Sequence, residues 1–119
     1  MKILPMPRDG SCLFHAFSKS LGVTVQGLRN LCAQVEEDDL IAGQPFRIWL
    51  GEDTLEEYRR QVVSPHHWGS ALEIAIFVER YRLQVNVYQR DESKIVLSHD
   101  HPEQRIDLLF HDDHYDLLI

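Results

Sequence analysis

One cysteine in this chain stands where a nucleophile would be expected. Cys12 follows the polar turn Asp9-Gly10-Ser11, and the apolar residues after it recur at helical spacing, so the sequence predicts a helix that begins at Cys12. Free N–H groups and the positive end of the helix dipole favour an anion at a helix N-terminus. A thiol placed there can have its pKa lowered from about 8.5 to about 3.5–7.5. Cys12 is therefore the candidate nucleophile, and the same N–H groups could hold an oxyanion.

A thiol nucleophile also needs a base within hydrogen-bond reach and a third group that orients the base. His114 and Asp116 offer both, because residues i and i+2 of a strand project from the same face. If a strand begins at His114, Asp116 can accept from one imidazole nitrogen while the other faces Cys12. We therefore predict that the C-terminal end of the chain folds back so that His114 contacts Cys12.

The other cysteine and the remaining histidines have simpler explanations. Cys32 is predicted to face the core, because it belongs to an apolar run at helical spacing: Leu28, Leu31, Cys32 and Val35. We expect a local contact for His15 and structural roles for His66 and His67. One alternative stays open, a metal site built from His99, His101, His111 and His114 with Asp112 or Asp113. It is disfavoured, because these residues lack a compact ligand spacing and leave Cys12 unexplained.

Helices are predicted for the N-terminal half of the chain. The first covers residues 12–21, and the second runs from a Thr24 cap to about Asp39. Residues 42–53 are predicted to form a loop in which Trp49 covers the core. Capping boxes at Thr54 and at Ser70 open two more helices. The helix after Ser70 is apolar nearly all round and is predicted to be the central buried helix.

From Leu83 onward the apolar residues alternate, which predicts strands. Residues 83–87 and 95–97 read as a hairpin, and residues 106–110 and 115–119 as a second pair of strands. The predicted fold class is α+β, with helices in the N-terminal half packed on a small, mostly antiparallel sheet from the C-terminal half. We expect residues 1–119 to form a single domain.

Composition excludes several classes of function. The chain has 119 residues, 44% of them apolar, and a net charge of −7. This acidic balance argues against a nucleic-acid partner, and no apolar run is long enough to cross a membrane. We expect no signal peptide at the start of the chain, since Pro5 and Pro7 interrupt it. Two cysteines without a disulfide pattern fit a reducing compartment, so we expect an intracellular protein.

The order of these motifs resembles the OTU (ovarian-tumour) family of cysteine peptidases. The resemblance rests on Asp9-Gly10-Ser11-Cys12-Leu13-Phe14 followed by His-Ala-Phe, on Trp68-Gly69 before a helix, and on His114-Tyr115-Asp116 before an apolar end. It covers nearly the whole chain. Two positions depart from the pattern, because Ser70 replaces a glycine common in the middle motif and Asp116 stands where many members have Asn. The chain is also short for an OTU domain.

The resemblance implies a papain-like OTU fold and deubiquitinase activity, with ubiquitin, polyubiquitin or a ubiquitin-like modifier as partner and no cofactor or metal. Cys12 would be the nucleophile, His114 the general base and acid, and Asp116 its orienter. Backbone amides of Asp9, Gly10, Ser11 and Cys12 would form the oxyanion hole, and Trp68 and Gly69 would support the site. Acidic side chains near the groove would suit the arginines of the ubiquitin tail, the candidates being Glu36, Asp38, Asp112 and Asp113.

Two other functions remain possible for the same residues. The fold could bind ubiquitin without turning it over, or it could be a papain-like peptidase with another substrate. The alternative metal site would instead make the protein a metal-dependent hydrolase.

Overall fold

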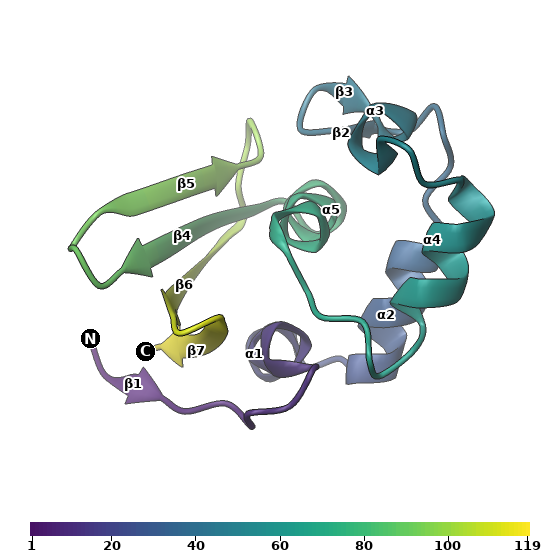
Figure 1. The fold of residues 1–119 in the computed structure, drawn as a ribbon. Helices are drawn as coiled ribbons and strands as arrows, with labels where there is room; N and C mark the ends of the chain where they lie inside the picture. The colour runs from purple at the N-terminus through teal and green to yellow at the C-terminus, as the bar shows by residue number, and fades with distance from the viewer.

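Helices fill the N-terminal half and strands the C-terminal half, as the apolar spacing predicts (Figure 1). The computed structural model describes residues 1–119. Its elements in chain order are β1 (Ile3–Leu4), α1 (Cys12–Leu21), α2 (Val25–Ala33), β2 (Leu40–Ile41), β3 (Gln44–Pro45), α3 (Phe46–Leu50), α4 (Leu55–Val62), α5 (Ala71–Tyr81), β4 (Leu83–Gln89), β5 (Lys94–Ser98), β6 (Gln104–His111) and β7 (His114–Leu118). None of the helices is both long and apolar enough to cross a membrane.

Five strands form one sheet in the order β1-β7-β6-β4-β5. All neighbouring strands are antiparallel except β4 and β6, which are parallel, so the prediction of a mostly antiparallel sheet is confirmed. The sequence did not reveal β1, because a strand of two residues has no measurable period. It extends the sheet beside β7, and the two ends of the chain lie next to each other (Figure 1).

Helices α1 and α5 pack on one face of the sheet, where α1 contacts β7 and α5 contacts β4 (Figure 1). The rings of Phe14 and Phe17 on α1 meet Phe77 on α5, with centroids 6.0 and 4.8 Å apart. Consecutive residues from Ile74 to Val78 are all buried, which confirms α5 as the central helix. The strand residues buried against these helices are Leu83, Val85, Val87, Ile106, Leu108 and Leu117.

Two boundary predictions were wrong. Helix α2 ends at Ala33 rather than near Asp39. The four acidic residues at positions 36–39 explain this, because the C-terminal end of a helix is electrostatically unfavourable for negative charge. The predicted loop over residues 42–53 contains the short helix α3. Trp49 does lie over the core as expected, and its Nε1 donates to the carbonyl of Ile41 at 2.8 Å.

Candidate active site

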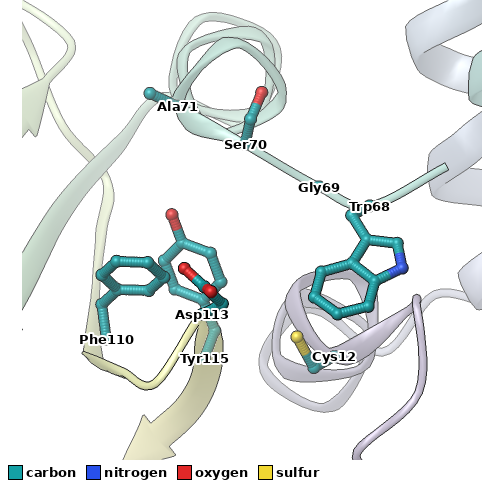
Figure 2. Close-up of a pocket in the computed structure, with 8 residues that line it drawn as sticks. All are labelled: Cys12, Trp68, Gly69, Ser70, Ala71, Phe110, Asp113 and Tyr115. Carbon is teal, nitrogen blue, oxygen red and sulfur yellow. The ribbon is translucent and has the colours of Figure 1, made fainter.

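Cys12 is the first residue of α1 and is 6% exposed. Leu13, Phe14 and Phe17 are fully buried, so the residues that follow Cys12 anchor this end of α1 in the core. The thiol opens into a pocket lined by Cys12, Trp68, Gly69, Ser70, Ala71, Phe110, Asp113 and Tyr115. Figure 2 shows Cys12 and Trp68 on one side of this pocket and Phe110, Asp113 and Tyr115 on the other. The pocket therefore joins the start of α1 to the turn between β6 and β7.

His114 and Asp116 are both buried on β7, and their side chains contact each other as the i, i+2 spacing predicts. His114 Nε2 lies 2.7 Å from Asp116 Oδ1. The other ring nitrogen of His114, Nδ1, makes no hydrogen bond in the structure. One imidazole nitrogen is thus oriented by a carboxylate and the second is available, which is the arrangement that a general base needs.

Asp116 has two further donors that the sequence did not indicate. The backbone N–H of Met6 donates to Oδ1 at 2.8 Å, and His111 Nε2 lies 2.9 Å from Oδ2. Burial by itself raises the pKa of Asp116, but the hydrogen bonds from His111, Met6 and His114 outweigh it, so the pKa falls below its ordinary value. Asp116 is therefore an anion held by three donors.

No hydrogen bond joins Cys12 to His114 in the structure, although Cys12 shares its pocket with Asp113 and Tyr115, the two neighbours of His114 in the chain. Alternation along β7 puts Tyr115 on one face of the strand and His114 on the other. Hydrogen bonds between catalytic groups are often long without substrate and tighten when substrate binds. The fold thus places both chain neighbours of His114 at the pocket, and the direct contact between His114 and Cys12 stays a prediction.

The turn before Cys12 is held by Asp9. Its Oδ1 accepts from the backbone N–H of Ser11 at 2.8 Å, and its Oδ2 lies 3.4 Å from His15 Nε2, the local contact expected of that histidine. The amide of Ser11 is therefore occupied and not free for an oxyanion here. The N–H groups of Asp9, Gly10 and Cys12 make no hydrogen bond within the chain.

A buried arginine, which the sequence analysis did not single out, supports this turn from behind. Arg29 on α2 is 1% exposed and donates to Ser11 Oγ at 2.7 Å and to the carbonyl of His67 at 2.9 Å. It also donates to the carbonyl of Val62 at 3.1 Å and lies over the ring of Phe14. Burial lowers the pKa of the guanidinium, which nearby anionic groups partly offset. Arg29 thus connects α2, the Cys12 turn and the segment before α5.

The two residues proposed as structural support, Trp68 and Gly69, differ in their surroundings. A Cβ on Gly69 would lie 2.5 Å from Leu13 Cδ2, so only glycine allows this segment to cross α1 so closely. Trp68 is 59% exposed and packs beside Gly10 at the rim of the pocket. Gly69 therefore brings two segments together, whereas most of the Trp68 side chain remains open to solvent.

Residues 7–113 match the model of a family described as OTU-like cysteine protease. The chain belongs to this family. The match ends one residue before His114, so the roles of His114 and Asp116 are not covered by it.

Curated relatives of this OTU domain include Ubiquitin thioesterase OTU1 of Saccharomyces cerevisiae, which is 28% identical over 120 residues, or 99% of this chain and 39% of that protein. OVARIAN TUMOR DOMAIN-containing deubiquitinating enzyme 2 of Arabidopsis thaliana is 26% identical over 119 residues, or 95% of this chain and 55% of that protein. The chain thus spans between about a third and about half of the length of the curated relatives it matches.

Solved structures share the OTU fold. An OTU domain in complex with ubiquitin matches with a TM-score of 0.82 and 24% identity, over 98% of this chain and 67% of that chain. An OTU deubiquitinase from Wolbachia pipientis wMel bound to ubiquitin matches with a TM-score of 0.70 and 18% identity, over 99% of this chain and 94% of that chain. The predicted papain-like OTU fold is thereby confirmed.

The serine that departs from the OTU pattern is accommodated by the cap of α5. Ser70 and Glu73 form the predicted capping box, in which the Ser70 N–H donates to Glu73 Oε1 at 2.8 Å. Glu73 is completely buried and also accepts from Tyr58 Oη at 2.7 Å, with His67 Nε2 at 3.5 Å. Burial raises the pKa of Glu73, but contacts from His67, Tyr58 and Ser70 outweigh it, and the net pKa is lowered.

The four acidic candidates for substrate arginines fall into two groups. Three form ion pairs within the chain: Glu36 with Arg59, Asp38 with Arg47, and Asp112 with Arg90. Asp113 forms no ion pair and lines the pocket that contains Cys12. Of the four, Asp113 is therefore the residue whose position suits a substrate cation.

The alternative metal site is not assembled. The structure contains no group of three or more His, Cys, Asp or Glu side chains that could hold a metal ion. His99 and His101 lie in the loop between β5 and β6, whereas His111 and His114 flank the turn between β6 and β7 and share Asp116.

Proposed function

We propose that this OTU domain is a cysteine-type deubiquitinase that hydrolyses the isopeptide or peptide bond after the C-terminal glycine of ubiquitin or of a ubiquitin-like modifier. The main support is the pocket in which Cys12 meets both neighbours of His114, together with the His114–Asp116 hydrogen bond. The names of the curated relatives point to the same substrate. We propose residues 1–119 as one catalytic domain, because one core cluster spans both halves of the chain.

In this mechanism Cys12 loses its proton to His114, and the thiolate attacks the carbonyl carbon of the terminal glycine. The oxyanion accepts hydrogen bonds from free amides of the turn, those of Gly10 and Cys12 being nearest the nucleophile in sequence. Protonated His114 then donates to the leaving lysine amine, and a thioester remains. Water attacks the thioester with His114 as base, which releases the glycine carboxylate and restores the thiol. Asp116 orients His114 in both steps.

A ubiquitin probe with a C-terminal electrophile tests this proposal. We expect a covalent adduct with the wild-type chain, none with Cys12→Ala, and a strongly slowed reaction with His114→Ala. Cys32→Ala is the matched control and should still be labelled, since Cys32 is fully buried and burial raises the pKa of its thiol. Binding of ubiquitin without any adduct would instead favour the silent binding module.

The substrate specificity and location follow as parts of the same proposal. A panel of diubiquitin linkages, incubated with the wild type and Cys12→Ala, distinguishes a deubiquitinase from a papain-like peptidase that cleaves only unrelated peptides. Both cysteines are free thiols, which suits a reducing compartment, and we propose an intracellular location. Immunofluorescence of the tagged chain checks it.

A further inference from the structure

A second histidine lies beside the proposed base. Strands β6 and β7 are joined by Asp112 and Asp113, both with positive φ (52° and 57°), the backbone of a two-residue hairpin turn. This turn makes His111 and His114 direct cross-strand partners, with ring centroids 5.7 Å apart. Side chains of such partners project from the same face of the sheet. His111 therefore faces the same carboxylate as His114.

The two histidines contact different oxygens of Asp116. His114 Nε2 lies 2.7 Å from Oδ1 and His111 Nε2 lies 2.9 Å from Oδ2, while the Met6 N–H also binds Oδ1. Hydrogen bonds to a carboxylate are charge-assisted and stronger than those between neutral groups. With both oxygens bound, Asp116 cannot turn about its Cβ–Cγ bond without losing such bonds.

His111 is itself held in place. Its side chain is only 14% exposed, and its Nδ1 lies 3.4 Å from Asp112 Oδ2. Asp112 in turn accepts from Arg90 at 2.7 Å. The ring of His111 thus lies between two carboxylates, one buried and one at the surface. A chain of polar contacts runs from Arg90 at the surface to His114.

We propose that His111 is a positioning residue for the triad proposed above, on which this inference rests. His111 donates its Nε2–H to Asp116 Oδ2 and fixes the carboxylate so that Oδ1 remains aimed at His114. His111 is not the base, because both of its ring nitrogens lie against carboxylates, whereas Nδ1 of His114 makes no hydrogen bond in the structure.

The test measures alkylation of Cys12 by iodoacetamide at pH 7, a readout that needs no ubiquitin. We expect His111→Leu to slow alkylation about tenfold, because it removes one hydrogen bond to a charged group. His111→Gln offers an amide donor at a similar reach and should restore most of the rate. His101→Leu, a change at an exposed histidine of the β5–β6 loop, should leave the rate unchanged. If His111→Leu does not fold, His111→Asn, whose amide is too short to reach Oδ2, takes its place.

A double-mutant comparison separates positioning from general damage to the fold. In an Asp116→Ala background, His111→Leu should have no further effect on alkylation, because its target is gone. The same tenfold loss in that background would overturn the proposal, as would an unchanged rate in the single variant. If His111→Leu alone lowers the alkylation rate as much as His114→Ala does, His111 is the base instead. If the alkylation rate depends on His111 but the ubiquitin probe does not label the chain, the proposed ubiquitin substrate is contradicted and the positioning role of His111 is not.

Discussion

The guanidinium of Arg29 donates a 2.7 Å hydrogen bond to Oγ of Ser11, the residue directly before the candidate nucleophile. The same side chain binds the carbonyls of Val62 and His67. One buried cation thus sets the distance between α2, the end of α4 and the Cys12 turn. Its loss would leave several buried acceptors without a partner, which is costly.

We expect Arg29→Leu to lower the free energy of unfolding by about 3–5 kcal/mol, because it unpairs a buried polar cluster. Arg29→Lys keeps the charge but loses the planar fork and should cost about 1–3 kcal/mol. Urea unfolding measures both. Arg60→Leu, at an exposed position on α4, is the control and should change stability by about 0.5 kcal/mol or less. Equal stabilities of the Arg29 and Arg60 variants would contradict the assigned role.

Variants of Asp116 test the orienting role. Asp116→Ala removes the acceptor for His114 and should lower kcat/KM on a fluorogenic ubiquitin substrate about 100-fold. Asp116→Asn keeps an oxygen that can accept from His114 and should lose only about tenfold. Thermal unfolding of each variant shows whether it is folded. A wild-type kcat/KM for Asp116→Ala would contradict the orienting role of Asp116.

Asp113 should affect binding of substrate more than chemistry. Its carboxylate is unpaired and lines the Cys12 pocket, so Asp113→Asn should raise KM for ubiquitin substrates with kcat nearly unchanged. Alkylation of Cys12 by iodoacetamide, which carries no charge, should not change. Glu36→Gln, which alters an acid already paired with Arg59, serves as the comparison. A similar KM effect in both variants would point to overall charge instead of a local contact.

Gly69→Ala should destabilise the protein by about 1–3 kcal/mol, because its Cβ would lie 2.5 Å from Leu13 Cδ2. The clash falls on the residue after Cys12, so labelling by a ubiquitin probe should slow as well. Gly43→Ala has open space and only an unfavourable φ, so it should cost about 1 kcal/mol and leave labelling intact. The melting temperatures and the labelling rates of the Gly69→Ala and Gly43→Ala variants test this prediction.

Stability should fall in acid as two buried carboxyls become protonated. The pKa values of Glu73 and Asp116 are lower in the folded chain than their ordinary values of about 4. The unfolded chain therefore binds more protons in this range, so the stabilisation is complete above about pH 4–5 and is lost as the pH falls through the folded pKa values. Melting temperatures between pH 6 and pH 3 measure this. The double variant Glu73→Gln, Asp116→Asn should show a shallower decline, and an equally steep one would assign the acid sensitivity to other groups.

Local sequence patterns were sufficient to predict those features of the structure that depend on contacts between residues close together in the chain. The caps at Thr24 and Ser70 formed as predicted, because each uses a side chain and an amide three residues apart. The i, i+2 spacing likewise predicted the contact between His114 and Asp116. The period of the apolar residues was enough to identify α5 as the buried helix.

His111 illustrates what was missed although a signal existed. The apolar alternation leaves residues 111–114 between two predicted strands, but His111 was assigned only to an alternative metal site. A two-residue turn makes the flanking residues cross-strand partners, which would have put His111 beside His114. The hydrogen bond to Asp116 could not be foreseen without the side-chain positions.

The sequence by itself determined the types of the main elements, the position of the candidate nucleophile Cys12 at the start of a helix and the contact between His114 and Asp116. Only the tertiary structure decided that Arg29 is buried behind the Cys12 turn, that Met6 and His111 saturate Asp116, and that Asp113 alone among the acidic candidates reaches the pocket. The reason is physical. Periodicity and capping are local properties of the chain, whereas the partner of a buried polar group depends on which distant segments pack against each other.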